Sequence, residues 1–146
     1  MLTVPIEAGK VLDIAFVGDA HLIETPPKSR KDDYFAAVIS KINWIMDTND
    51  VIVFLGDVFE RSVMSIPSFH KVAIEILKRR KQGKRIFSIL GNHDIPHYQA
   101  QSLSRTSLGL MNSLGLIKLF DYLEQKIHLP WAIDAIFQDN NIVRFF

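Results

Sequence analysis

Three apolar runs, each followed by a glycine and then an oxygen-bearing side chain, constrain this chain more than any other feature of its sequence. They lie at 14–17, 51–55 and 86–90 and lead into Gly18-Asp19, Gly56-Asp57 and Gly91-Asn92. A continuous apolar run between turn signals predicts a strand buried on both faces, as in parallel sheets covered by helices. Parallel strands end on the same edge of a sheet, so the side chains after the three runs are expected to converge there.

The three glycines are expected to allow sharp turns and the close approach of a bound group. Any one of them alone could be an ordinary glycine at the end of a strand. Three in the same position, each followed by a residue that can bind a metal, favour a functional site.

Apolar residues at helical spacing predict helices between these strands. The first helix is expected over about 31–47, with Asp32 and Asp33 in its first turn, where carboxylates suit the helix dipole. The second is expected to begin near Pro67 and to end near Gly83.

A third helix is predicted over 103–114, followed by a short strand over 116–120. The alternation of strands and helices predicts an α/β fold, with a mostly parallel sheet flanked by helices. A doubly wound arrangement with right-handed crossovers is the expected topology.

Composition limits both the class of protein and the kind of metal site. The 146 residues fit one domain and include no cysteine, so His, Asp, Asn and water are the available ligands for a metal. Lys and Arg number 17 against 16 Asp and Glu, so any attraction to a polyanion must be local. No signal peptide and no membrane-spanning run is recognisable, which favours a cytoplasmic protein without a membrane partner.

The residues after the strands suit a pair of hard or borderline divalent ions. Asp19 and His21 flank a single residue, so on an extended strand end they would point to the same side and grip one ion. Asp57 could offer one oxygen to each of two ions, and Asn92 could supply a neutral oxygen to the second. Two such ions can clamp the attacking and leaving oxygens of a phosphoryl displacement.

Further residues near these motifs have predicted roles. His93 is expected to project toward substrate, where it could steady the phosphoryl oxygens or protonate the leaving group, with Asp94 as the partner that orients its imidazole. Lys28, Arg30 and Lys31 are candidate contacts to nucleic-acid phosphates, although a solvated loop is an equally good interpretation.

The motifs Asp19-Ala20-His21, Gly56-Asp57 and Gly91-Asn92-His93-Asp94, in this order, resemble the first three signatures of the calcineurin-like metallophosphoesterases. The resemblance covers about 12–120. It implies a layered metallophosphoesterase fold and a two-metal phosphoesterase. It places Asp19 and His21 on one ion, Asp57 between the two, Asn92 on the other, and His93 in catalysis.

Within that family the chain looks most like the SbcD-type DNA nucleases. The similar segments are 30–35 after the first motif, 56–60 with its aromatic residue, and Asp94, where phosphatases tend to have Glu. The resemblance implies manganese as the divalent ion, DNA as substrate, an SbcC-like ATPase subunit as partner, and a role in DNA repair or recombination.

Family members also have a second half with further metal-binding histidines, typically in Gly-His-x-His, and this pattern does not occur in residues 1–146. The chain is therefore expected to be an N-terminal half that binds metal weakly alone and needs a second polypeptide to supply the missing histidines. Alternatives are a catalytically weak interaction module and another kind of metallophosphatase. Apolar residues over 103–114 and 127–146 predict a homo-oligomer or a complex.

Overall fold

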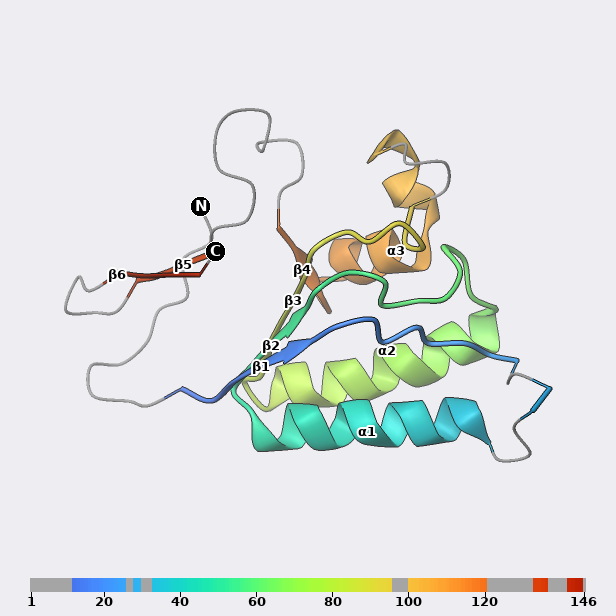
Figure 1. Cartoon of the computed structure of the whole chain (residues 1–146), viewed down its shortest axis with the longest axis horizontal. Coiled ribbons are helices and arrows are strands. Elements are labelled where there is room, and N and C mark those ends of the chain that lie inside the picture. Colours follow the sequence, from blue (N-terminus) through green and yellow to red (C-terminus); the bar gives the residue numbers. More distant parts are fainter. Residues whose placement is uncertain are drawn as a thin grey trace.

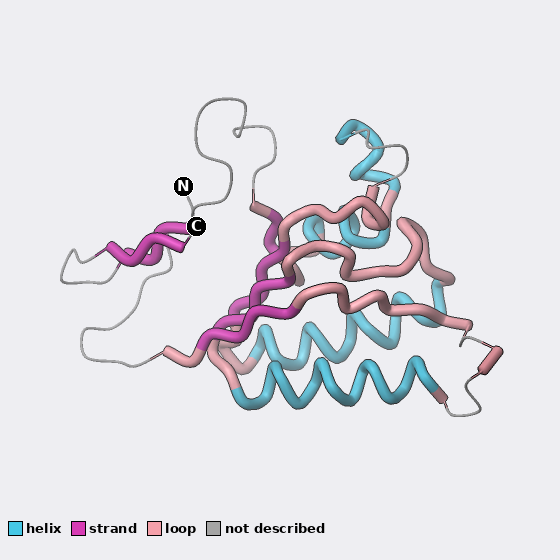
Figure 2. Tube along the Cα trace, viewed as in Figure 1, coloured by secondary structure: helices cyan, strands magenta, loops and turns pink. Residues whose placement is uncertain are grey.

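The computed structural model of the chain describes residues 12–25, 28–29, 33–95, 100–120, 133–136 and 142–145. Four parallel strands form its main sheet in the order β1-β2-β3-β4. Their bounds are β1 Ile14–Val17, β2 Val51–Phe54, β3 Arg85–Ser88 and β4 Lys118–Leu119. The expected parallel α/β fold is therefore confirmed (Figures 1 and 2).

The helices alternate with these strands along the chain. They are α1 Tyr34–Thr48, α2 Ile66–Lys81, a 3-10 helix η2 Ala100–Arg105 and α3 Ser107–Ser113. A second, two-stranded antiparallel sheet is formed by β5 Ile133–Ile136 and β6 Ile142–Phe145. The predicted interface segments at 127–132, 137–141 and 146 lie outside the described residues.

The doubly wound topology predicted from the sequence is wrong, because the helices share one face of the sheet. Buried side chains of α1, α2 and α3 form a single core with Ile52, Phe54 and Ile86. The alternate residues Val51, Val53 and Phe87 belong to a separate cluster. The strand order does not reverse from β1 to β4, so right-handed crossovers bring α1, α2 and α3 to the same face of the sheet.

Burial follows the position of each strand in the sheet. All four residues of β2 are buried, as predicted for a central strand. The prediction of burial on both faces is wrong for β1, which is an edge strand and leaves Phe16 49% exposed.

Local capping explains where the helices begin. Asp33 is the N-cap of α1, and its side chain accepts a hydrogen bond from the N–H of Ala36. Asp33 therefore precedes the first turn of the helix, in which it was expected, and Asp32 lies outside the described residues. Ser65 caps α2, with Pro67 in the first turn as predicted. Thr106 caps α3 and separates it from η2, so the expected continuous helix over 103–114 is two helices.

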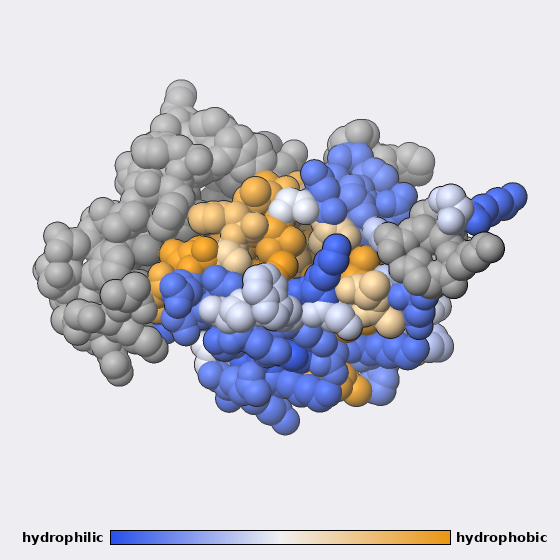
Figure 3. Space-filling view, turned by 60° about the horizontal axis from the view of Figure 1, so that its bottom comes forward, coloured by the Kyte–Doolittle hydropathy of each residue, from blue (hydrophilic) through white to orange (hydrophobic). Residues whose placement is uncertain are grey.

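The outer surface of the adjacent helices α1 and α2 is mostly hydrophilic (Figure 3). In Figure 3 it lies below a band of hydrophobic residues. Within the part of the chain that the structure describes, no helix is both long and apolar enough to cross a bilayer.

Candidate metal centre

The sheet brings the three predicted motifs to one edge. β1, β2 and β3 are adjacent and in parallel register, with Val17 beside Phe54 and Phe54 beside Ser88. The segments that carry Asp19, Asp57 and Asn92 therefore leave neighbouring strands on the same side of the sheet.

The backbone at this edge is left-handed at the metal-capable residues. Asp19, His21 and Asp57 have φ values of 45°, 41° and 47°, and they are the non-glycine residues with positive φ in the described part of the chain. The expectation that Asp19 and His21 lie on an extended strand end is therefore wrong. Left-handed backbone is costly for residues with a Cβ and concentrates at functional sites.

Hydrogen bonds beyond the strand ends hold these turns in place. The N–H of His21 donates to the carbonyl of Asp57 at 2.9 Å, and the N–H of Glu60 donates to the carbonyl of Leu22 at 3.1 Å. Leu22 and Phe59 also form a parallel bridge, and both are fully buried. The loops after β1 and β2 thus pair with each other and fix His21 relative to Asp57.

Two of the three glycines are required by their surroundings. Gly56 has φ +93°, and a Cβ on Gly91 would lie 2.1 Å from Oδ1 of Asp57 and 2.2 Å from its backbone nitrogen. A Cβ on Gly18 would meet nothing within 4 Å, so the predicted need for a glycine there is not observed. Gly91 is the glycine that lets two loops meet at Asp57.

Asp19, His21 and Asp57 each present one ligand atom within 4.8 Å of the others. The N–H of His93 donates to Oδ1 of Asp57 at 2.8 Å and so orients that carboxylate. Asn92 precedes His93 in the same turn and is exposed. The sequence-predicted ligands on β1 and β2 thus lie together, with Asn92 at the same edge of the sheet.

The donors in this group fit a divalent cation. Two carboxylates and an imidazole suit hard or borderline ions. Nδ1 of His21 is buried and makes no hydrogen bond among the described residues, although it lies beside the carboxylate of Glu60.

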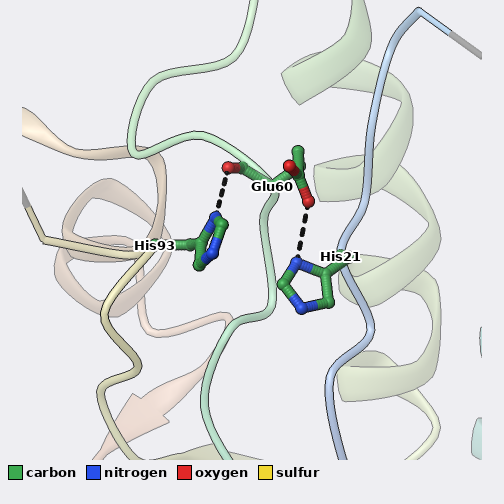
Figure 4. Close-up of side chains that lie close together, drawn as sticks. All are labelled: His21, Glu60 and His93. Atoms are coloured by element: carbon green, nitrogen blue, oxygen red, sulfur yellow. Dashed lines mark hydrogen bonds and ion pairs between the residues drawn. The ribbon is translucent and has the colours of Figure 1, made fainter. Parts of the chain in front are cut away.

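Glu60 contacts both histidines, through different groups (Figure 4). Its Oε2 lies 2.8 Å from Nδ1 of His21, at the distance of an ion pair but without the direction of a hydrogen bond. Its backbone carbonyl accepts a hydrogen bond from Nδ1 of His93 at 2.9 Å. The two imidazole rings meet edge to face, with centroids 4.8 Å apart.

The hydrogen bond to the carbonyl of Glu60 raises the pKa of His93, and the nearby carboxylates of Asp57, Glu60 and Asp94 act in the same direction. Because a carbonyl can only accept, Nδ1 of His93 carries a proton. Nε2 is then the ring nitrogen that can bind or exchange a proton.

Asp94 was predicted to orient the imidazole of His93, but its carboxylate instead accepts hydrogen bonds from backbone N–H groups. Its oxygens accept the N–H groups of Phe59 at 3.3 Å and Gly91 at 3.0 Å, while His93 uses its Nδ1 on Glu60. The side chain is completely buried, and this burial raises the pKa of the Asp94 carboxyl despite its N–H donors. Asp94 therefore joins the loops after β2 and β3 to each other.

The predicted phosphate-contacting residues are only partly described. Lys28 lies in a turn and is exposed, whereas Arg30 and Lys31 fall outside the described residues. A hollow of about 90 Å³ lies between the loops after β1 and β2, and its lining includes Glu24, Glu60 and Arg61.

Glu60 is the residue that sequence reasoning missed. It follows Asp57 by three positions, beyond the Gly-Asp motif, and no ligand pattern marks it. Its importance depends on the pairing between the loops after β1 and β2, which a single sequence does not display.

Comparison with known proteins adds the family. The model of a protein family described as calcineurin-like phosphoesterase matches residues 12–144. No curated protein matches the chain.

Proposed function

Because this chain belongs to the calcineurin-like phosphoesterase family, we propose that the carboxyl edge of its sheet hydrolyses phosphodiester bonds in DNA, as SbcD-like nucleases do. The observation that carries the proposal is the convergence of Asp19, His21 and Asp57 at one edge of the sheet. Left-handed backbone at all three positions supports a functional site there.

In this proposal Asp19 and His21 would hold one divalent ion, Asn92 would help to hold a second, and Asp57 would serve both. Bound ions of this kind polarise phosphoryl oxygens and lower the pKa of a bound water toward neutrality. Manganese is the proposed ion, because the carboxylate, amide and imidazole donors suit it.

The chain's own residues supply orientation and a proton. The backbone N–H of His93 holds Asp57 in place, and the carbonyl of Glu60 holds the ring of His93. With Nδ1 committed to that carbonyl, His93 can deliver a proton from Nε2 to the leaving oxygen. Its raised pKa favours the protonated ring that this step requires.

DNA as the substrate rests on the resemblance to SbcD-type nucleases in segments 30–35 and 56–60 and at Asp94. The backbone N–H of residue 59 donates to Asp94 at 3.3 Å, so two of these similar segments are in contact in the interior. Lys28, whose side chain is exposed, is proposed to contact a DNA phosphate, as are Arg30 and Lys31, which lie outside the described residues.

Partners follow from the same proposal. Each ion needs more ligands than the group around Asp57 offers, and histidines from a second polypeptide would complete the set. An SbcC-like ATPase subunit is the proposed partner in DNA processing. Leu110 and Leu114 of the α3 region are 45% and 57% exposed, which supports self-association or a protein contact there.

The function is tested with manganese, linear DNA and two chromogenic substrates, a phosphodiester and a phosphomonoester. We expect manganese-dependent cleavage of DNA and the diester, at a low rate for the chain alone and a higher rate with a second half that supplies histidines. Asp57→Asn should lower the rate more than about a hundredfold, because it removes a charge from a metal ligand. The matched control is Asp47→Asn, at the far end of α1.

Hydrolysis of the monoester alone would replace the nuclease by a phosphatase. Absence of hydrolysis, even with the second half present, would favour the interaction module. Cleavage that survives Asp57→Asn would contradict the proposed centre.

A further inference from the structure

We propose that His21, Glu60 and His93 form a second cation position, of the His-His-carboxylate type, that is suited to zinc. This position competes for His21 with the group of Asp19, His21 and Asp57. The three residues each present one ligand atom within 4.8 Å of the others. Two imidazoles and one carboxylate are a recurrent zinc-binding set in proteins.

The contact between His21 and Glu60 brings two potential ligand atoms together without a hydrogen bond between them. Oε2 of Glu60 lies 2.8 Å from Nδ1 of His21, yet this nitrogen has no hydrogen-bond partner among the residues that the structure describes. Two donor atoms that are each about 2.1 Å from one tetrahedral zinc ion lie about 3.4 Å apart, so the carboxylate of Glu60 would move outward by about half an ångström to share an ion with His21. A cation bound by both residues would give this buried nitrogen a partner, and no hydrogen bond between His21 and Glu60 would be needed.

His93 is prepared for the same ion by its own orienting contact. Metal-binding histidines usually donate their second ring N–H to a carbonyl or carboxylate, which fixes the ring and its tautomer. Nδ1 of His93 contacts the carbonyl of Glu60 at 2.9 Å and leaves the lone pair on Nε2. Glu60 would therefore bind the ion through its side chain and orient a second ligand through its backbone.

The two groups cannot both be filled without competition, because His21 belongs to each. A neutral imidazole offers one lone pair, so an ion held with Glu60 and His93 withdraws His21 from Asp19 and Asp57. On the proposed function, zinc would then act as an inhibitor that occupies both histidines.

The test measures zinc binding by competition with a chromogenic chelator, with Zn²⁺ as the probe, in the full 146-residue chain. We expect Glu60→Gln and His93→Asn to weaken one zinc equivalent more than about tenfold, because each removes a ligand. Asp19→Asn and Asp57→Asn should leave that equivalent in place. Glu24→Gln is the matched control, since Glu24 lines the same hollow as Glu60 but belongs to neither group.

Glu60→Gln keeps the backbone N–H and carbonyl that bond to Leu22 and His93, and circular dichroism of each variant verifies the fold. Zinc binding unchanged by Glu60→Gln would overturn the proposal. Equal weakening by Glu60→Gln and Asp57→Asn would also overturn it, because zinc would then occupy a single shared centre. If the variants bind zinc as expected and the chain hydrolyses no phosphodiester, the proposed function is contradicted and the zinc position is not.

Discussion

The two ends of the parallel sheet follow different rules. At the amino end, Arg79 of α2 joins Asp47 of α1 and Glu75 of its own helix in ordinary ion pairs between regular helices. At the carboxyl end, left-handed residues and a buried carboxylate surround two histidines. The first end meets the usual preferences of helices and surfaces, while the second departs from them where metal-capable groups gather. Among the described non-glycine residues, left-handed backbone is therefore confined to the candidate site.

The largest effect is expected from a single methyl group at the carboxyl end. Gly91→Ala would place its Cβ 2.2 Å from the backbone nitrogen of Asp57, so the loop itself must move. We expect a loss of about 3 kcal/mol in the free energy of unfolding, together with weaker metal binding. Gly18→Ala is the control and should change stability by less than about 0.5 kcal/mol, since nothing lies within 4 Å. Equal urea midpoints for the two variants would remove the steric argument.

Asp94→Asn tests whether the buried carboxylate joins the two loops. An amide offers one acceptor where Asp94 now accepts N–H groups from both Phe59 and Gly91, so a donor is left unsatisfied. Urea unfolding should show a loss of about 2 kcal/mol. The same substitution at the exposed N-cap, Asp33→Asn, should be nearly neutral, because either residue caps a helix well. Equal losses at the two positions would contradict the special role of Asp94.

The preference between glycine and alanine should invert between the two regions. At Asp19, with φ 45°, the glycine variant should be more stable than the alanine variant by about 1 kcal/mol. At Lys71, exposed on α2, the alanine variant should be more stable by about 1 kcal/mol. Thermal melts of the four variants measure both differences. The same sign at both positions would show that Asp19 is not strained.

The smallest expected effect is the pH dependence of stability that comes from the ion pairs of Arg79 at the amino end of the sheet. Hydrogen bonds from Arg79 lower the pKa of Asp47, and those from Lys78 and Arg79 lower the pKa of Glu75. Stability from these carboxylates is present above their unfolded pKa values and is lost as the pH falls through the lowered folded values.

Arg79→Met should therefore reduce the free energy of unfolding at pH 7 by about 1 kcal/mol or less and by still less at about pH 2. Urea unfolding at both pH values checks this, with Lys71→Met as the control on the same helix. A deficit that grows as the pH falls would contradict the assignment.

The same division explains how much the sequence could predict. Apolar runs and helical spacing identified the strands and helices, because burial dominates in regular elements. The meeting of Asp19, His21 and Asp57 followed from parallel strands that end on one edge. Their roles as ligands stay predictions.

Features that depend on pairing between distant loops were not predictable. The conformation of Asp19 and His21, the burial of Asp94 and the two contacts of Glu60 arise from loops that meet across β1, β2 and β3. The position of the helices on one face required the strand order, which a strand-helix alternation leaves open.

Equilibrium binding of manganese tests the central claim most directly, because it needs no substrate, partner or second polypeptide. The chain would be titrated with Mn²⁺ while electron paramagnetic resonance follows the free ion, in the wild type, Asp57→Asn and Asp47→Asn. We predict more than about tenfold weaker binding for Asp57→Asn and unchanged binding for Asp47→Asn. Wild-type binding by Asp57→Asn would show that the carboxyl edge of the sheet is not the metal centre.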